Sequence, residues 1–69
     1  MSNILVLTAK EVEVLNMLSE GMSNKEISSY MNIRTSTVKW HIGNIFCKLN
    51  AKNRTHASNL AREHGLLSV

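Results

Sequence analysis

Apolar side chains recur along the chain at the three- and four-residue spacing of amphipathic α-helices, in stretches separated by short polar breaks. The clearest stripe consists of Val38, Ile42, Ile45 and Leu49, at i, i+4, i+7 and i+11. At 100° per residue these four side chains lie within about 60° of one another. The pattern predicts an all-α fold with four helices, over residues of about 8–20, 23–31, 35–50 and 54–64.

Capping residues place the ends of the first two helices. Thr8 with Glu11, and Ser23 with Glu26, each form the pattern of a capping box, and Gly21 is a suitable residue to end the first helix. Apolar pairs that could staple these entries are Leu7 with Val12 and Met22 with Ile27. The two boxes indicate two helices joined by a tight turn.

The polar break after residue 49 separates the third helix from a fourth. Asn53 can cap the fourth helix, and Gly65 ends it. Its apolar positions are few, so we expect it to hold the core only modestly, with help from Leu66, Leu67 and Val69. A short helix, a tight turn and a longer helix form a helix-turn-helix, whose second helix fits the major groove of DNA.

The side of the third helix opposite the apolar stripe carries Lys39, Trp40, Gly43, Asn44 and Cys47. A tryptophan is normally placed in a core or an interface, because its large apolar surface is costly to leave in water. This side is therefore expected to meet a partner. The alternative is that Trp40 folds down onto Phe46 or onto the turn.

Basic residues gather in the second half of the chain. Residues 1–26 carry two lysines and four glutamates, residues 27–62 carry six basic side chains and no acid, and Glu63 completes the net charge: −2 + 6 − 1 = +3. The six are Arg34, Lys39, Lys48, Lys52, Arg54 and Arg62. An acid-free half-chain suits a polyanionic partner, and the alternative is a solvated basic surface.

Other classes of function find little support. The 69 residues make one domain, and the single cysteine excludes an internal disulfide, which favours a reducing cytoplasm. The run ILVL at residues 4–7 is too short to cross a bilayer and lacks the flanks of a signal peptide. We expect no enzyme, no cofactor and no metal site, because the chain has no activated nucleophile, glycine-rich phosphate loop or Cys/His zinc spacing. The rival interpretation is a protein-interaction module anchored by Trp40.

Five strings resemble the LuxR/FixJ/GerE family of bacterial DNA-binding domains: LTAKEVEVL (7–15), GMSNKEI (21–27), TVKWHIGNIFCKL (37–49), NRTHA (53–57) and GLL (65–67). They follow the family's order and spacing over nearly the whole chain. The resemblance implies one DNA-binding domain over residues 1–69, with an extension at 1–6 and a helix-turn-helix core at about 23–50. Within these strings, the residues VKWH, NIF, KL and NRT are most similar to the C-terminal domains of MalT-like ATP-dependent activators. The implied function is sequence-specific binding of double-stranded DNA by a bacterial transcription regulator or its effector domain.

The resemblance also implies roles for individual residues. It places base contacts at Lys39, Trp40 and Gly43, and phosphate contacts at Asn24, Lys25, Thr37, Asn44 and Lys48. Arg34 is a further candidate DNA contact. The resemblance also makes the fourth helix the dimer contact, and we expect a weak homodimer, formed mainly on DNA, through Thr55, Ser58, Asn59 and Arg62. RNA polymerase is a further candidate partner.

Two positions depart from the family's pattern. Arg34 stands where the family usually has a serine cap, so we expect Thr35 or Ser36 to take over and shift the helix start. Gly43 replaces a side chain that commonly contacts DNA. It either lets the backbone approach the groove, makes room for Trp40, or is tolerated drift.

A further alternative concerns Glu11, which could pair with Arg54 or Lys48 in addition to its capping role.

Overall fold

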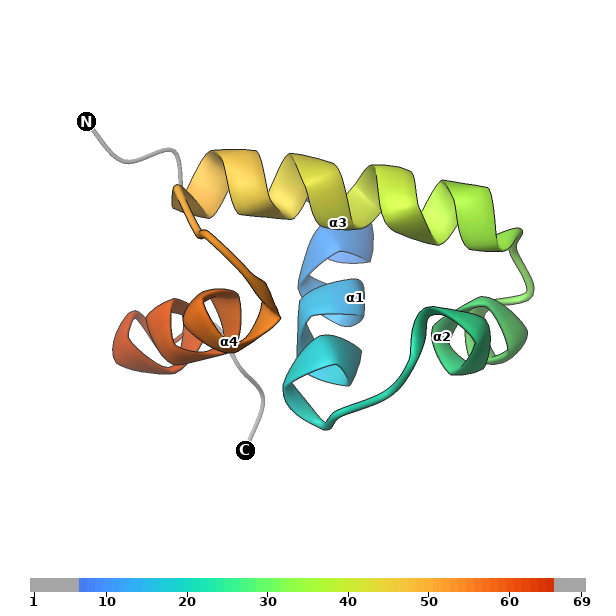
Figure 1. The fold of residues 1–69 in the computed structure, drawn as a ribbon, viewed down its shortest axis with the longest axis horizontal. Helices are drawn as coiled ribbons and strands as arrows, with labels where there is room; N and C mark the ends of the chain where they lie inside the picture. The colour runs from blue at the N-terminus through green and yellow to red at the C-terminus, as the bar shows by residue number, and fades with distance from the viewer. Residues whose placement is uncertain (1–6, 66–69) are drawn as a thin grey trace.

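A computed structural model describes residues 7–65 and contains four α-helices in that range (Figure 1). They are α1 (Ala9–Ser19), α2 (Asn24–Met31), α3 (Thr35–Leu49) and α4 (Arg54–Glu63). Every bound lies within one residue of the predicted one, so the all-α prediction is confirmed. The expected extension at residues 1–6 and the core contribution of Leu66, Leu67 and Val69 lie outside the described residues.

Helix α1 forms the centre of the fold. It packs against both α3 and α4, whereas α2 packs against α3. In Figure 1, α3 runs along one side of the molecule, with α2 beneath its N-terminal end and α4 near its C-terminal end. The long side of α3 that faces away from α1 is therefore left uncovered by the other helices.

Side-chain caps begin three of the four helices. The Oγ1 of Thr8 accepts from the Glu11 amide at 3.1 Å, and the Glu11 carboxylate accepts from the Thr8 amide at 2.9 Å. The box of Ser23 and Glu26 closes in the same way, at 3.1 and 2.8 Å. Both predicted capping boxes are confirmed. The predicted cap of Asn53 is confirmed as well, because its Oδ1 accepts from the amide of residue 56 at 2.8 Å.

Helix α3 begins without a side-chain cap. Arg34 is its N-cap residue and makes no capping hydrogen bond with its side chain. The expectation that Thr35 or Ser36 takes over the cap was wrong. The backbone ladder starts at Arg34, whose carbonyl accepts from the Val38 amide at 3.1 Å. The burial of Val38 holds this first turn in place, so a side-chain cap is not required to fix the start.

Left-handed residues end the first three helices in the same way. Gly21, Asn32 and Asn50 have φ values of 83°, 57° and 56°. In each case the next residue's amide donates to a carbonyl five residues earlier: Met22 to Met17 at 3.1 Å, Ile33 to Ser28 at 3.0 Å, and Ala51 to Phe46 at 2.9 Å. These bonds form Schellman motifs, and Met22, Ile33 and Ala51 also pack against the core. Each turn therefore adds an apolar contact as it stops a helix.

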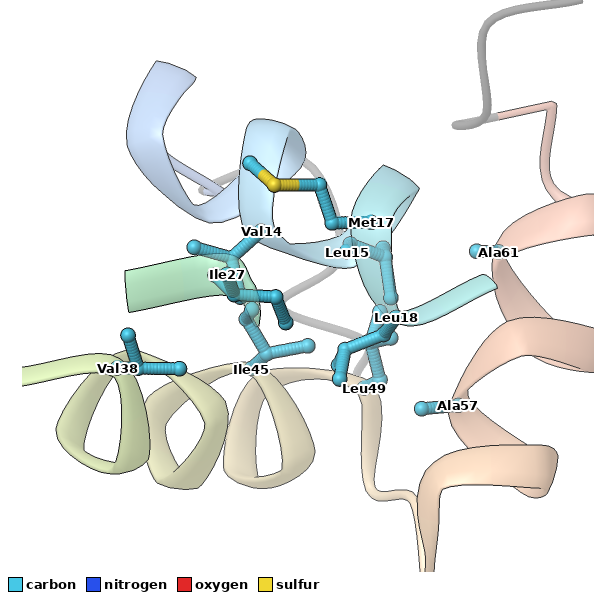
Figure 2. Close-up of a cluster of buried hydrophobic side chains, with 10 residues drawn as sticks. All are labelled: Val14, Leu15, Met17, Leu18, Ile27, Val38, Ile45, Leu49, Ala57 and Ala61. Carbon is cyan, nitrogen blue, oxygen red and sulfur yellow. The ribbon is translucent and has the colours of Figure 1, made fainter. Parts of the chain in front are cut away.

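The core is a single cluster of ten buried apolar side chains (Figure 2). Its members are Val14, Leu15, Met17, Leu18, Ile27, Val38, Ile45, Leu49, Ala57 and Ala61. Three of the four predicted stripe positions on α3 are buried, and Ile42 is half-buried at the edge of the cluster. Because this stripe fixes the rotation of α3 about its axis, the opposite side of the helix faces solvent.

Candidate nucleic-acid interface

The outer face of α3, comprising Lys39, Trp40, Gly43 and Cys47, is exposed to solvent. Trp40 leaves 63% of its surface exposed, although it is one of the largest apolar side chains in the chain. It has not folded onto Phe46. Its indole instead contacts the ring of His41 edge to face, with ring centroids 5.2 Å apart. The indole of Trp40 and the ammonium of Lys39 therefore both project into solvent from a helix whose opposite side is packed into the core.

One edge of the outer face is bordered by a polar flank, comprising Thr37, His41, Asn44 and Lys48. These residues follow one another at i, i+4, i+7 and i+11 and are all half-buried. Three of the four were predicted to contact phosphate. Lys39 lies on the other side of the outer face. The structure thus places the predicted base contacts on the exposed side of α3 and three of the predicted phosphate contacts along its edge.

The space around Gly43 is open. A Cβ atom built at this position would meet no heavy atom within 4 Å outside the local backbone. The indole of Trp40 does not occupy that space, so the suggestion that Gly43 makes room for Trp40 is wrong for the free domain. Close approach of a partner to the helix backbone at Gly43 stays a prediction, and tolerated drift stays its alternative.

Lys48 connects the polar flank to the start of α1. Its ammonium lies 2.7 Å from Oε1 of Glu11, whose side chain is only 5% exposed, compared with 26% for Lys48. Burial raises the pKa of the Glu11 carboxyl, but the hydrogen bonds from Lys48 and Thr8 and the charge of Lys48 outweigh it and leave the pKa lowered. Of the two partners considered for Glu11, the structure therefore selects Lys48. The same carboxylate caps α1 and anchors the C-terminal end of α3.

Arg54 joins α4 to the beginning of α2. Its guanidinium donates to Oδ1 of Asn24 at 3.0 Å and to the carbonyl oxygen of Met22. Asn24 and the neighbouring Lys25 were both predicted to contact phosphate. The side-chain oxygen of Asn24 is already used by Arg54, whereas Lys25 is exposed. These hydrogen bonds of Arg54 to the segment that begins α2 were not predicted, because the two partners lie 30 and 32 residues away in sequence.

Two exposed side chains lie in the helix-turn-helix beside these groups. Arg34 precedes α3 and is exposed, which leaves it accessible as the candidate contact that the sequence suggested. Tyr30, near the end of α2, is 73% exposed and was missed by the sequence analysis. The helical wheel gave no clear signal, because Tyr30 lies three residues after the buried Ile27 and therefore only about 60° from it around the helix.

The candidate dimer face lies on α4. Thr55, Asn59 and Arg62 are exposed, and Ser58 is half-buried. All four line a cleft of about 430 Å³ between α4 and the end of α1, together with Leu18, Ser19, Gly21 and Arg54. The face is thus hollow, and it lies on a different helix from the outer face of α3.

Within residues 7–65, no three histidine, cysteine or acidic side chains gather closely enough to hold a metal ion. None of the helices in this range has the length and apolar character needed to cross a membrane.

Residues 5–61 match the family described as bacterial regulatory proteins of the luxR family, also called GerE. The chain is 49% identical over 55 residues to the nitrate/nitrite response regulator NarP of Escherichia coli, covering 80% of this chain and 26% of NarP. It is 42% identical over 62 residues to the response regulator VraR of Staphylococcus aureus, covering 90% and 30%. It is 40% identical over 62 residues to the transcriptional regulator AlkS of Ectopseudomonas oleovorans, covering 90% and 7%.

A solved structure shows the same fold. The crystal structure of the response regulator ChrA, from a heme-sensing two-component system, matches with a TM-score of 0.86 and 39% identity, over 88% of this chain and 30% of ChrA. The chain therefore spans less than a third of the length of each of these relatives.

Proposed function

The chain belongs to the luxR family of bacterial regulatory proteins, and we propose that it binds double-stranded DNA by placing the outer face of α3 in the major groove, as the DNA-binding part of a transcription regulator. The relatives AlkS, NarP and VraR are named as transcriptional or response regulators, which supports this function. The same family membership counts against the rival interpretation of a protein-interaction module.

The observation that carries the proposal is the exposure of Lys39 and Trp40 on a helix whose opposite side is locked into the core. An α-helix fits the major groove, where each base pair presents its own pattern of donors and acceptors. Lys39 lies near the N-terminal end of α3, the part of a recognition helix that contacts base edges. Its ammonium can donate to O6 and N7 of guanine, while the indole of Trp40 supplies apolar contact and Gly43 permits close approach.

Phosphate contacts would flank the bases. Thr37 and Asn44 lie along the polar flank, and Lys25 is exposed at the first turn of α2. Asn24 follows the N-cap of α2, where amide groups suit a phosphate oxygen even though its side-chain oxygen is bound to Arg54. Lys48 has three donors, so its ammonium can keep Glu11 and still reach a phosphate. Such contacts fix the register of the helix in the groove.

Three finer features belong to the same proposal. Two copies would pair weakly on DNA through Thr55, Ser58, Asn59 and Arg62, whose polar character suits a transient contact. RNA polymerase would be the protein partner of the DNA-bound regulator. The parent protein would be a MalT-like ATP-dependent activator, because the residues VKWH, NIF, KL and NRT resemble those of such proteins. ATP binding by the full-length protein tests that assignment.

Selection from a random pool of double-stranded DNA tests the proposal. We expect one related set of duplexes to be enriched, and their affinity to fall linearly with the logarithm of salt concentration, because phosphate contacts release counterions. Failure to enrich any sequence, or an affinity that does not respond to salt, would contradict the proposed function.

A further inference from the structure

The contact between Trp40 and His41 is unusual for neighbouring residues on a helix. Successive side chains point about 100° apart, so i and i+1 do not normally face each other. Here the ring centroids are 5.2 Å apart and the planes are inclined at 60°. This is the T-shaped arrangement that aromatic pairs prefer. The two rings therefore meet where the outer face of α3 borders the polar flank.

His41 is the anchored member of the pair. Trp40 is 63% exposed, whereas His41 is half-buried and its Nδ1 atom is buried. That atom has no hydrogen-bond partner among the described residues. Buried polar atoms are normally paired, so a histidine is a poor choice if the position serves packing alone. The ring of His41 instead contacts the indole of Trp40.

We propose that His41 is a positioning residue for DNA recognition: its T-shaped contact holds the indole of Trp40 in the orientation that meets the bases. This inference rests on the proposed function of α3. A large exposed side chain that rotates freely loses that freedom when it binds, which weakens binding. By restricting the indole beforehand, His41 removes part of that loss. The contact is worth a factor of about 2 to 12 in an equilibrium constant.

Trp40 is the only tryptophan of the chain, so its fluorescence reports on the contact without DNA. The variants are a matched pair: His41→Leu fills the site without an aromatic ring, and His41→Phe keeps the ring without a polar nitrogen. The control is His64→Leu, the same exchange at an exposed position at the end of α4. In the free domain, His41→Leu should increase acrylamide quenching of Trp40 and lower its fluorescence anisotropy. His41→Phe and His64→Leu should leave both close to the wild-type values.

Binding is then measured on the duplex most enriched from a random pool by the wild-type domain. His41→Leu should lower the affinity about 2- to 12-fold, and His41→Phe should restore it. In a Trp40→Ala background, His41→Leu should cause no further loss, because the residue acts through the indole. Circular dichroism checks the fold of each variant, and His41→Gln replaces any His41→Leu protein that does not fold.

Equal losses for His41→Leu and His41→Phe would overturn the proposal, since they would mean that the imidazole nitrogens contact DNA directly. So would unchanged quenching in His41→Leu, or a full additional loss in the Trp40→Ala background. A wild-type domain that enriches no duplex would overturn the proposed function and this role with it. In that case the quenching data would still show whether His41 holds the indole.

Discussion

The Nζ atom of Lys48 lies 2.7 Å from Oε1 of Glu11, across 37 residues of sequence, and joins the end of α3 to the start of α1. The carboxylate also accepts the Thr8 amide that begins α1. One buried side chain therefore sets both a helix start and the position of the proposed recognition helix. It also holds the ammonium that we assign to a DNA phosphate.

Removing the cation of this pair should lower the free energy of unfolding more than removing the negative charge of Glu11. Lys48→Met leaves a carboxylate that is 5% exposed without its cation, and should lower the free energy of unfolding by about 1–3 kcal/mol. Glu11→Gln should cost less, because the amide oxygen can still accept from Thr8 and the ammonium of Lys48 reaches water. Urea denaturation of both single variants and the double variant measures the difference. Equal stability of Lys48→Met and the wild type would show that the pair contributes nothing.

The same pair predicts a loss of stability in acid. The pKa of Glu11 is lowered from 4.5, because the bonds and charge of its partners outweigh burial. A carboxyl with a depressed folded-state pKa stabilises the fold above its unfolded pKa, and this contribution disappears as the pH falls through the folded value. Melting temperatures of the wild type should therefore fall below pH 4.5, and those of Glu11→Gln should fall less. Parallel curves for the two proteins would exclude Glu11 as a source of the acid sensitivity.

Gly43→Ala should separate stability from binding. The added methyl meets no atom within 4 Å, so relief of the glycine penalty should raise the free energy of unfolding by about 0.5–1 kcal/mol. On DNA the same methyl would stand between the backbone of α3 and the bases, and the affinity should fall. Thermal unfolding and binding to the selected duplex measure the two effects. A stabilised variant that binds as tightly as the wild type would remove Gly43 from the interface.

The free domain should be a monomer that pairs on DNA. Thr55, Asn59 and Arg62 are exposed polar groups on α4, and stable interfaces bury about 1,600 Å² with an apolar centre. Sedimentation at micromolar concentration should show a single copy without DNA and two copies on a duplex with two half-sites. A tight dimer in the absence of DNA would refute this expectation.

Local signals made most of the fold predictable. The boxes at Thr8 and Ser23 and the stripe from Val38 to Leu49 involve residues close in sequence, so their geometry follows from the helix itself. The left-handed Asn32 and Asn50 were not predicted, because asparagine takes this conformation only in some contexts. The uncapped start of α3 at Arg34 was predicted wrongly for a similar reason, since burial of Val38 rather than a local cap fixes that turn.

The sequence predicted which surface of the protein contains the site, but not the contacts that hold its residues in place. Periodicity indicated which side of α3 faces outward, and the exposure of Lys39 and Trp40 agrees with it. Contacts between distant segments were beyond the sequence: the choice of Lys48 over Arg54 as partner of Glu11, and the clamp that Arg54 forms on Asn24. The first depends on how α1 packs against α3, and the second on how α4 lies relative to α2, which no single segment encodes.

The most direct measurement compares Lys39→Ala with Lys48→Ala on the selected duplex and on each of its single-base variants, at several salt concentrations. Lys39→Ala should abolish about 1–3 kcal/mol of discrimination at one position of each half-site, because the ammonium is assigned to a base edge. Lys48→Ala should weaken all duplexes alike. Its effect on the salt slope should be below about one unit, because Glu11 already neutralises this ammonium. Lys10→Ala, an exposed lysine on α1, is the control and should change neither property. If Lys39→Ala weakens every duplex equally, or leaves them all unchanged, the assignment of Lys39 to a base edge is wrong.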